Sequence, residues 1–176
     1  MDFLSGLFKN SKSKKYEQLY EEAKTFIQVH YVRERGSERY AFNTLSIKSD
    51  PEREACEEWY KSHGAPELFQ DIVQLYLNEN HIKSSTLCTE YNLESRVFSK
   101  NNSSFSVEKW EAVAVCFGLD LNISEARALL KRAGYALTNS SESDLVIRFC
   151  LENDIYEFKD INYLLTKICD RTLEQI

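Results

Sequence analysis

The segment IKSSTLCTEYNLESRVFSK, residues 82–100, has the pattern of two short helices joined by a tight turn. Its serine pair at 84–85 can cap a first helix that reaches Glu90. Asn92 suits the left-handed backbone conformation of a turn. Residues 93–100 then predict a second short helix, whose core side chains would be Leu93, Val97 and Phe98.

Helical periodicity continues on both sides of this segment. Apolar residues recur at three- and four-residue intervals over 68–82, 107–117, 123–133 and 155–168. Glycines follow two of these runs, at positions 118 and 134, where helix ends often require them. We therefore expect an all-α fold, a compact multi-helix bundle that contains a helix-turn-helix.

The region before the bundle has a weaker pattern. It predicts an amphipathic helix over 16–30, weakly extended character over 40–50 and a helix over 51–62. We predict three parts: a flexible N-terminal tail (1–15), a smaller mixed or helical extension for self-association or docking (16–64), and the helix-turn-helix domain (65–176). The tail's apolar and lysine residues leave a membrane-surface or partner-docking peptide as the alternative to disorder.

Composition narrows the class of protein. The 176 residues have a net charge of −6 and are 43% hydrophobic, so the chain can bury a core but does not form a general nucleic-acid coat. No uncharged apolar run approaches about 18 residues, so we expect no membrane span. The five cysteines form no C-x-x-C pair, which favours reduced thiols and a cytoplasmic location. They are Cys56, Cys88, Cys116, Cys150 and Cys169.

The second short helix carries the candidate binding residues. In a helix-turn-helix, its exposed side can reach base edges in the DNA major groove, and flanking side chains contact phosphates. The base-edge candidates are Glu94, Ser95, Arg96, Ser99 and Lys100. The phosphate candidates are Lys83, Lys109, Asn101 and Asn102. The alternative for Arg96 and Lys100 is that they are solvated charges on an exposed helix.

Residues 82–100 resemble the lambda-repressor-like (Xre- and Cro-type) helix-turn-helix family. The chain is more closely similar to a bacterial helix-turn-helix family with an AGYAL-type C-terminal extension, on the segments LLKRAGYAL (129–137), SSESDLVIRF (140–149) and NDIYEFKDIN (153–162). FIQVHYV (26–32) also resembles an element that often precedes this domain. The resemblance implies a DNA-binding protein.

Two functions follow as expectations. The first is an intracellular transcriptional regulator that binds duplex DNA as a homodimer, since a monomer with few phosphate contacts gains little at physiological salt. The alternative is a non-catalytic adaptor that binds a protein partner, because Glu90 and Glu94 intrude on the DNA face. We expect no enzyme activity, cofactor, metal or small-molecule ligand, since the spacing of His, Cys and carboxylates matches no known site.

Overall fold

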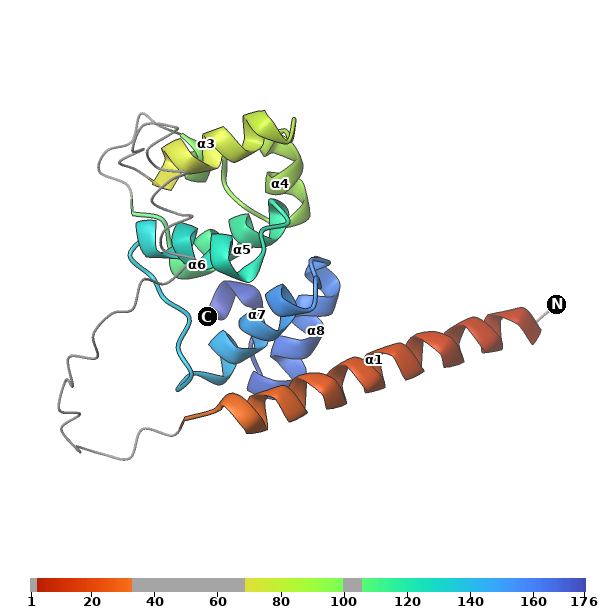
Figure 1. The fold of residues 1–176 in the computed structure, drawn as a ribbon. Helices are drawn as coiled ribbons and strands as arrows, with labels where there is room; N and C mark the ends of the chain where they lie inside the picture. Colours follow the sequence, from red (N-terminus) through yellow and green to blue (C-terminus); the bar gives the residue numbers. More distant parts are fainter. Residues whose placement is uncertain (1–2, 33–68, 100–105) are drawn as a thin grey trace. The chain divides into compact units, whose positions relative to one another are not determined.

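The computed structural model describes residues 3–32, 69–99 and 106–176, with side chains from residue 14 onward. All regular elements in these ranges are helices, which confirms the all-α prediction (Figure 1). The predicted extended stretch at 40–50 and helix at 51–62 lie outside them. The α-helices are α1 (Phe3–His30), α3 (Phe69–Glu79), α4 (Ser84–Glu90), α5 (Lys109–Gly118), α6 (Ile123–Arg132), α7 (Glu142–Glu152) and α8 (Phe158–Cys169); the 3₁₀ helices are η1 (Ser95–Phe98) and η2 (Leu173–Gln175).

The chain divides into two compact units, residues 1–32 with 137–176, and residues 33–136. The boundary that we predicted between 64 and 65 lies outside the described residues. The units also differ from the predicted domains, because the C-terminal helices group with α1 rather than with the helix-turn-helix region. Helix α1 begins at Phe3, where we expected a flexible tail up to residue 15.

In the first unit, α1 packs against α7 and α8. The contact face of α1 buries Ala23 and Ile27, and the Phe26 ring lies 5.5 Å from the ring of Phe149 in α7. Burial of this apolar face supplies the main stabilisation of a helix that has few strong helix formers near its start. The segment 26–32 is therefore part of the C-terminal helical unit.

The contact between α1 and α8 is partly polar. Lys15 Nζ donates to Oδ2 of the buried Asp160 at 2.9 Å. The Tyr16 and Tyr163 rings are 4.6 Å apart. The hydrogen bond to Asp160 raises the pKa of both Lys15 and Tyr16. This cluster attaches α1 to α8 at one defined point.

In the second unit, α5 is the most deeply buried element. Residues 111–117 are all buried, so this helix is covered around its circumference. Its last residue, Gly118, contacts α4, because a Cβ placed there would lie 2.7 Å from Cδ2 of Leu87. At the other end, the Tyr135 hydroxyl donates to the Val107 carbonyl at 3.0 Å.

The helix starts differ in part from the predicted caps. The N-cap of α5 is Glu108, which forms a capping box with Glu111. Helix α4 spans the predicted residues, yet its N-cap is Lys83 with no side-chain cap bond, so the two serines lie within the helix. Asn122 and Ser141 cap α6 and α7 through their side chains.

The helix ends follow one repeated design. The second residue after α3, α4, α5, α6 and α7 has a positive φ, and the next residue donates its N–H to the carbonyl five positions earlier. This is the Schellman closure, which satisfies the last carbonyls of a helix. Asn92 and Gly134 behave as predicted, with φ of 54° and 85°. The other three residues are His81, Asp120 and Asp154.

Candidate functional site

The segment predicted as a recognition helix, 93–100, is not an α-helix over its described residues. Glu94 and Ser99 have extended backbones on either side of η1, which is only four residues long. The core side chains are as predicted, since Leu93, Val97 and Phe98 are buried. Lys100 lies outside the described residues.

Tertiary hydrogen bonds explain this departure. The Phe98 carbonyl accepts a hydrogen bond from Nε2 of Gln74 in α3, at 2.9 Å. The Ser99 N–H donates to the Arg96 carbonyl, the bond that closes a 3₁₀ turn. Three buried side chains within six residues also fix the backbone against α3 and α4. Packing thus overrides local helical pattern here.

Arg96 lies at the centre of an acidic cluster. Its Nε donates to Oε2 of Glu94 at 2.6 Å, and its Nη2 donates to Oε1 of Glu111 at 3.0 Å. Glu111 is fully buried, and its other oxygen accepts the Glu108 N–H at 2.9 Å. The bond to Glu94 raises the pKa of the Arg96 guanidinium. This cation therefore compensates a buried carboxylate within its own unit.

These residues form the Arg96 cluster, which consists of Glu94, Arg96, Glu108 and Glu111 and was not predicted from the sequence. Glu111 is fifteen residues from Arg96, and only the fold brings them together. A signal was nevertheless present. Glu108 and Glu111 have capping-box spacing at the start of an otherwise apolar helix, and a carboxylate in such a helix needs a cationic partner.

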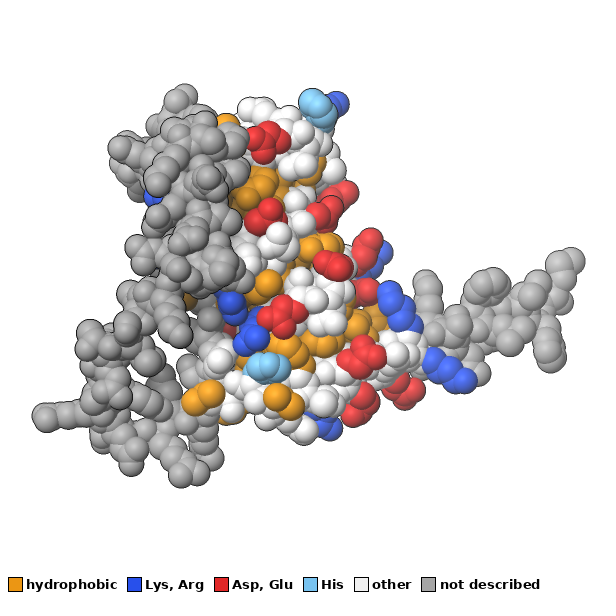
Figure 2. All heavy atoms as spheres, in the orientation of Figure 1, with side chains coloured by type: hydrophobic (Ala, Val, Ile, Leu, Met, Phe, Trp, Pro, Cys, Tyr) orange, Lys and Arg blue, Asp and Glu red, His pale blue; other side chains and the backbone are white. Residues whose placement is uncertain are grey.

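The other predicted contact residues that the structure describes differ in exposure. Lys83, Glu94 and Ser95 are exposed, whereas Ser99 and Lys109 are half-buried. Asn101 and Asn102 lie outside the described ranges. Among the coloured side chains on the face shown in Figure 2, acidic and basic groups are interspersed, and these described residues form no continuous stripe of either sign. A nucleic-acid surface instead concentrates cations along the phosphate path.

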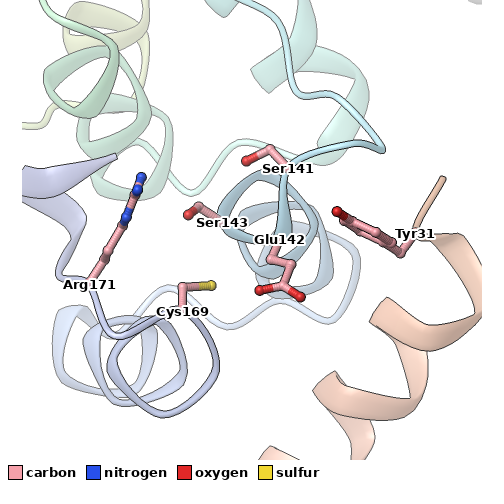
Figure 3. Close-up of a pocket in the computed structure, with 6 residues that line it drawn as sticks. All are labelled: Tyr31, Ser141, Glu142, Ser143, Cys169 and Arg171. Atoms are coloured by element: carbon pink, nitrogen blue, oxygen red, sulfur yellow. The ribbon is translucent and has the colours of Figure 1, made fainter. Parts of the chain in front are cut away.

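A cavity of about 370 Å³ lies in the first unit. Figure 3 shows that its lining comes from the end of α1, the start of α7 and the end of α8. The lining residues are Tyr31, Ser141, Glu142, Ser143, Cys169 and Arg171. The sequence offered no sign of this cavity, because these residues come from three distant segments.

The chemistry of this cavity is mixed. Arg171 and the start of α7 favour an anion, but the first turn of α7 also carries Glu142 and Asp144, which oppose one. Burial raises the pKa of the Cys169 thiol, so it has little thiolate character at neutral pH. The lining therefore does not select one class of ligand or reaction.

Three large apolar side chains are exposed at the end of α1, and we call them the apolar cluster: Val29, Tyr31 and Val32. Their exposed fractions are 73%, 39% and 53%. Backbone hydrogen bonds hold the segment, since Tyr31 N–H donates to the Ile27 carbonyl and Val32 N–H donates to the Asn139 carbonyl at 2.9 Å. Large apolar side chains that are exposed on an ordered backbone are typical of a protein-binding surface.

In the described ranges, no three His, Cys, Asp or Glu side chains lie close enough together to hold a metal ion. None of the helices in these ranges is long and apolar enough to cross a bilayer. The cysteines at positions 88, 116, 150 and 169 are free thiols.

Comparisons of the chain with protein-family models, with curated proteins and with solved structures find no match.

Proposed function

We propose that this chain is a non-catalytic protein-interaction adaptor. The observation that carries the proposal is the apolar cluster, in which Val29, Tyr31 and Val32 are exposed on a backbone fixed by hydrogen bonds to Ile27 and Asn139. Exposed apolar surface is costly in water and gains free energy when a partner covers it. Tyrosine adds a hydroxyl that can hydrogen bond at the edge of such an interface.

The Arg96 cluster supports an adaptor over a reader of DNA sequence. An arginine that recognises guanine uses its guanidinium in a bidentate contact with the base edge. In this chain the same group is already bonded to Glu94 and Glu111. A bidentate contact with a base would compete with these bonds, and loss of the bond to Glu111 would leave its buried carboxylate without this cation.

Capture of partners from a lysate of the source cells tests the adaptor proposal. The bait is the full chain, compared with a Val29→Asp, Val32→Asp variant and with a matched Gln28→Asp, Thr25→Asp control on exposed positions of the same helix. We expect proteins that bind the wild type and the control, that are lost with the variant, and that persist after nuclease treatment. Partners that disappear after nuclease, or that bind all three baits equally, would contradict the proposal.

DNA binding is the second candidate, and the order of elements favours it. Helices α3 and α4, the left-handed Asn92, η1, α5 and α6 follow one another as in the predicted helix-turn-helix, and Lys83 is exposed beside α4. A salt-titrated duplex-binding assay compares the wild type with Lys83→Ala and Arg96→Ala. A salt-dependent affinity that falls in Lys83→Ala supports this candidate. Affinity unchanged in both variants removes the segment from any DNA contact.

A further inference from the structure

The start of α1 is a part of the chain that neither proposal uses. The helix begins at Phe3, and Figure 1 shows its first turns running past the ends of α7 and α8, which belong to the same unit. The attachment of α1 to α8 begins at Lys15 and Tyr16, through Asp160 and Tyr163. The backbone of residues 3–14 therefore extends away from the packed part of this unit.

The composition of residues 3–15 is unlike that of the rest of the chain. This segment contains four lysines, at positions 9, 12, 14 and 15, and no Asp or Glu. The rest of the chain contains 18 of the 22 Lys and Arg and all 28 Asp and Glu. Four large apolar residues accompany the lysines: Phe3, Leu4, Leu7 and Phe8. The segment is thus a basic, apolar end on an acidic protein.

Helical register turns most of these apolar positions away from the face that packs in the first unit. Positions 3, 4, 7 and 8 share one face of a helix. The packing face contains Ala23, and counting back by seven, four and four residues leads to Tyr16, Lys12 and Phe8. The apolar face of residues 3–8 therefore meets the packing face at position 8, and its other three positions lie about 100° or more around the helix from Ala23.

We propose that residues 3–15 form an interfacial helix that binds the surface of an anionic lipid bilayer. Interfacial helices combine Phe and Leu on one face with Lys beside it, and they lie in the headgroup region rather than spanning the bilayer. Lysines near an anionic leaflet each add attraction that falls off within the Debye length. The concentration of positive charge in this segment favours a lipid surface over a protein partner, and it confines membrane contact to this end of the molecule.

Vesicle co-sedimentation of the full chain tests this inference independently of the adaptor function. The probes are phosphatidylcholine vesicles and phosphatidylcholine vesicles that contain phosphatidylserine. We expect binding to the second kind only, and weaker binding at higher salt. A Lys9→Glu, Lys12→Glu variant is expected to bind at least about tenfold more weakly. A Leu4→Glu, Phe8→Glu variant is expected to lose binding because the apolar face is removed.

The control carries the same change of charge elsewhere. Arg127→Glu, Lys131→Glu alters two exposed cations of α6 and is expected to bind within about twofold of the wild type. Circular dichroism of each variant checks that the total helix content is unchanged. Absence of binding to the anionic vesicles would overturn the inference. Equal weakening in the control, or capture of a protein through residues 3–15 with no vesicle binding, would also overturn it.

Discussion

Arg96 in η1 donates a hydrogen bond to the fully buried carboxylate of Glu111 in α5, with Nη2 and Oε1 3.0 Å apart. A buried carboxylate without a cation is strongly unfavourable, so this pair fixes where η1 lies against α5. The residue most suited by type to read a base is thus a structural partner of its own fold. Three properties of the second unit can be tested from this arrangement and from its helix ends.

Replacement of Glu111 is expected to be costly. Glu111→Ala leaves the Glu108 N–H without its acceptor and removes one of the two carboxylates bonded to Arg96. We expect the free energy of unfolding to fall by about 2–3 kcal/mol. Urea unfolding followed by circular dichroism measures this change.

The matched control is Glu94→Ala, which removes the exposed partner of Arg96. Exposed ion pairs contribute less than about 1 kcal/mol, so this variant should unfold close to the wild-type midpoint. Equal losses in the two variants would mean that burial of Glu111 does not determine the strength of the pair.

Gly118 and Gly134 are expected to resist alanine for different reasons. Gly134 has φ of 85° with open space around it, so Gly134→Ala costs about 1–2 kcal/mol through the backbone alone. Gly118→Ala brings a Cβ within 2.7 Å of the buried Leu87 side chain, and the cost comes from packing. Urea unfolding of Gly118→Ala with and without Leu87→Ala separates the causes.

The double variant should show a favourable coupling energy, because shortening Leu87 makes room for the new methyl group. The same test with Gly134→Ala and Leu87→Ala should give additive losses. Additive losses at Gly118 would show that its conformation, and not the contact with α4, is what requires glycine.

These helix ends also show how far sequence reasoning reaches. Asn92 and Gly134 could be predicted, because both residue types favour the left-handed conformation strongly. His81, Asp120 and Asp154 adopt the left-handed conformation although their residue types favour it less strongly. The apolar residue that follows each of them was the more general indication of these helix ends. The helix positions in the second unit followed from apolar spacing, since one face of each helix is buried.

The candidate site was less predictable for a physical reason. Local pattern favoured a helix over 93–100, but Gln74 and Glu111 bind this segment from other helices. At the start of α1 the difference is reversed. A glycine-containing segment that was predicted as a flexible tail is helical from Phe3. At 93–100 the result depends on groups outside the local sequence window.

Burial of the thiols predicts a selective pattern of alkylation. Burial raises the pKa of the Cys116 and Cys150 thiols far above neutral, and both side chains are inaccessible. Cys88 and Cys169 are half-buried. Because the thiolate is the reactive form, iodoacetamide should modify Cys88 and Cys169 first, and Cys116 and Cys150 at least about tenfold more slowly.

Peptide mass spectrometry at mildly alkaline pH, with and without urea, measures the four rates. These four cysteines, which are the ones in the described residues, should react at similar rates in urea. Rapid modification of Cys116 or Cys150 in the folded chain would contradict the buried positions of α5 and α7.

Asp120 lies at one of these helix ends, and its carboxyl is expected to make stability depend on pH. It follows α5 with φ of 50°, and burial raises the pKa of its carboxyl. The folded state then binds the proton more tightly than the unfolded state. Ionisation of Asp120 therefore lowers the free energy of unfolding as pH rises from the unfolded-state pKa through the raised folded-state pKa. The negative charge also lies beside the C-terminus of α5, where the helix dipole disfavours it.

Asp120→Asn removes the charge and keeps a side chain that tolerates this conformation. We therefore expect the free energy of unfolding to rise by about 0.5 kcal/mol at neutral pH. The gain should disappear below about pH 3, where the carboxyl is protonated in both states.

Urea unfolding at the two pH values measures the difference in stability between Asp120→Asn and the wild type. The control is Asp154→Asn. Asp154 also has a positive φ, 53°, after α7, and its carboxylate accepts a hydrogen bond from the Tyr156 hydroxyl. A gain for Asp120→Asn that is the same at both pH values would show that conformation, and not charge, limits stability at this helix end.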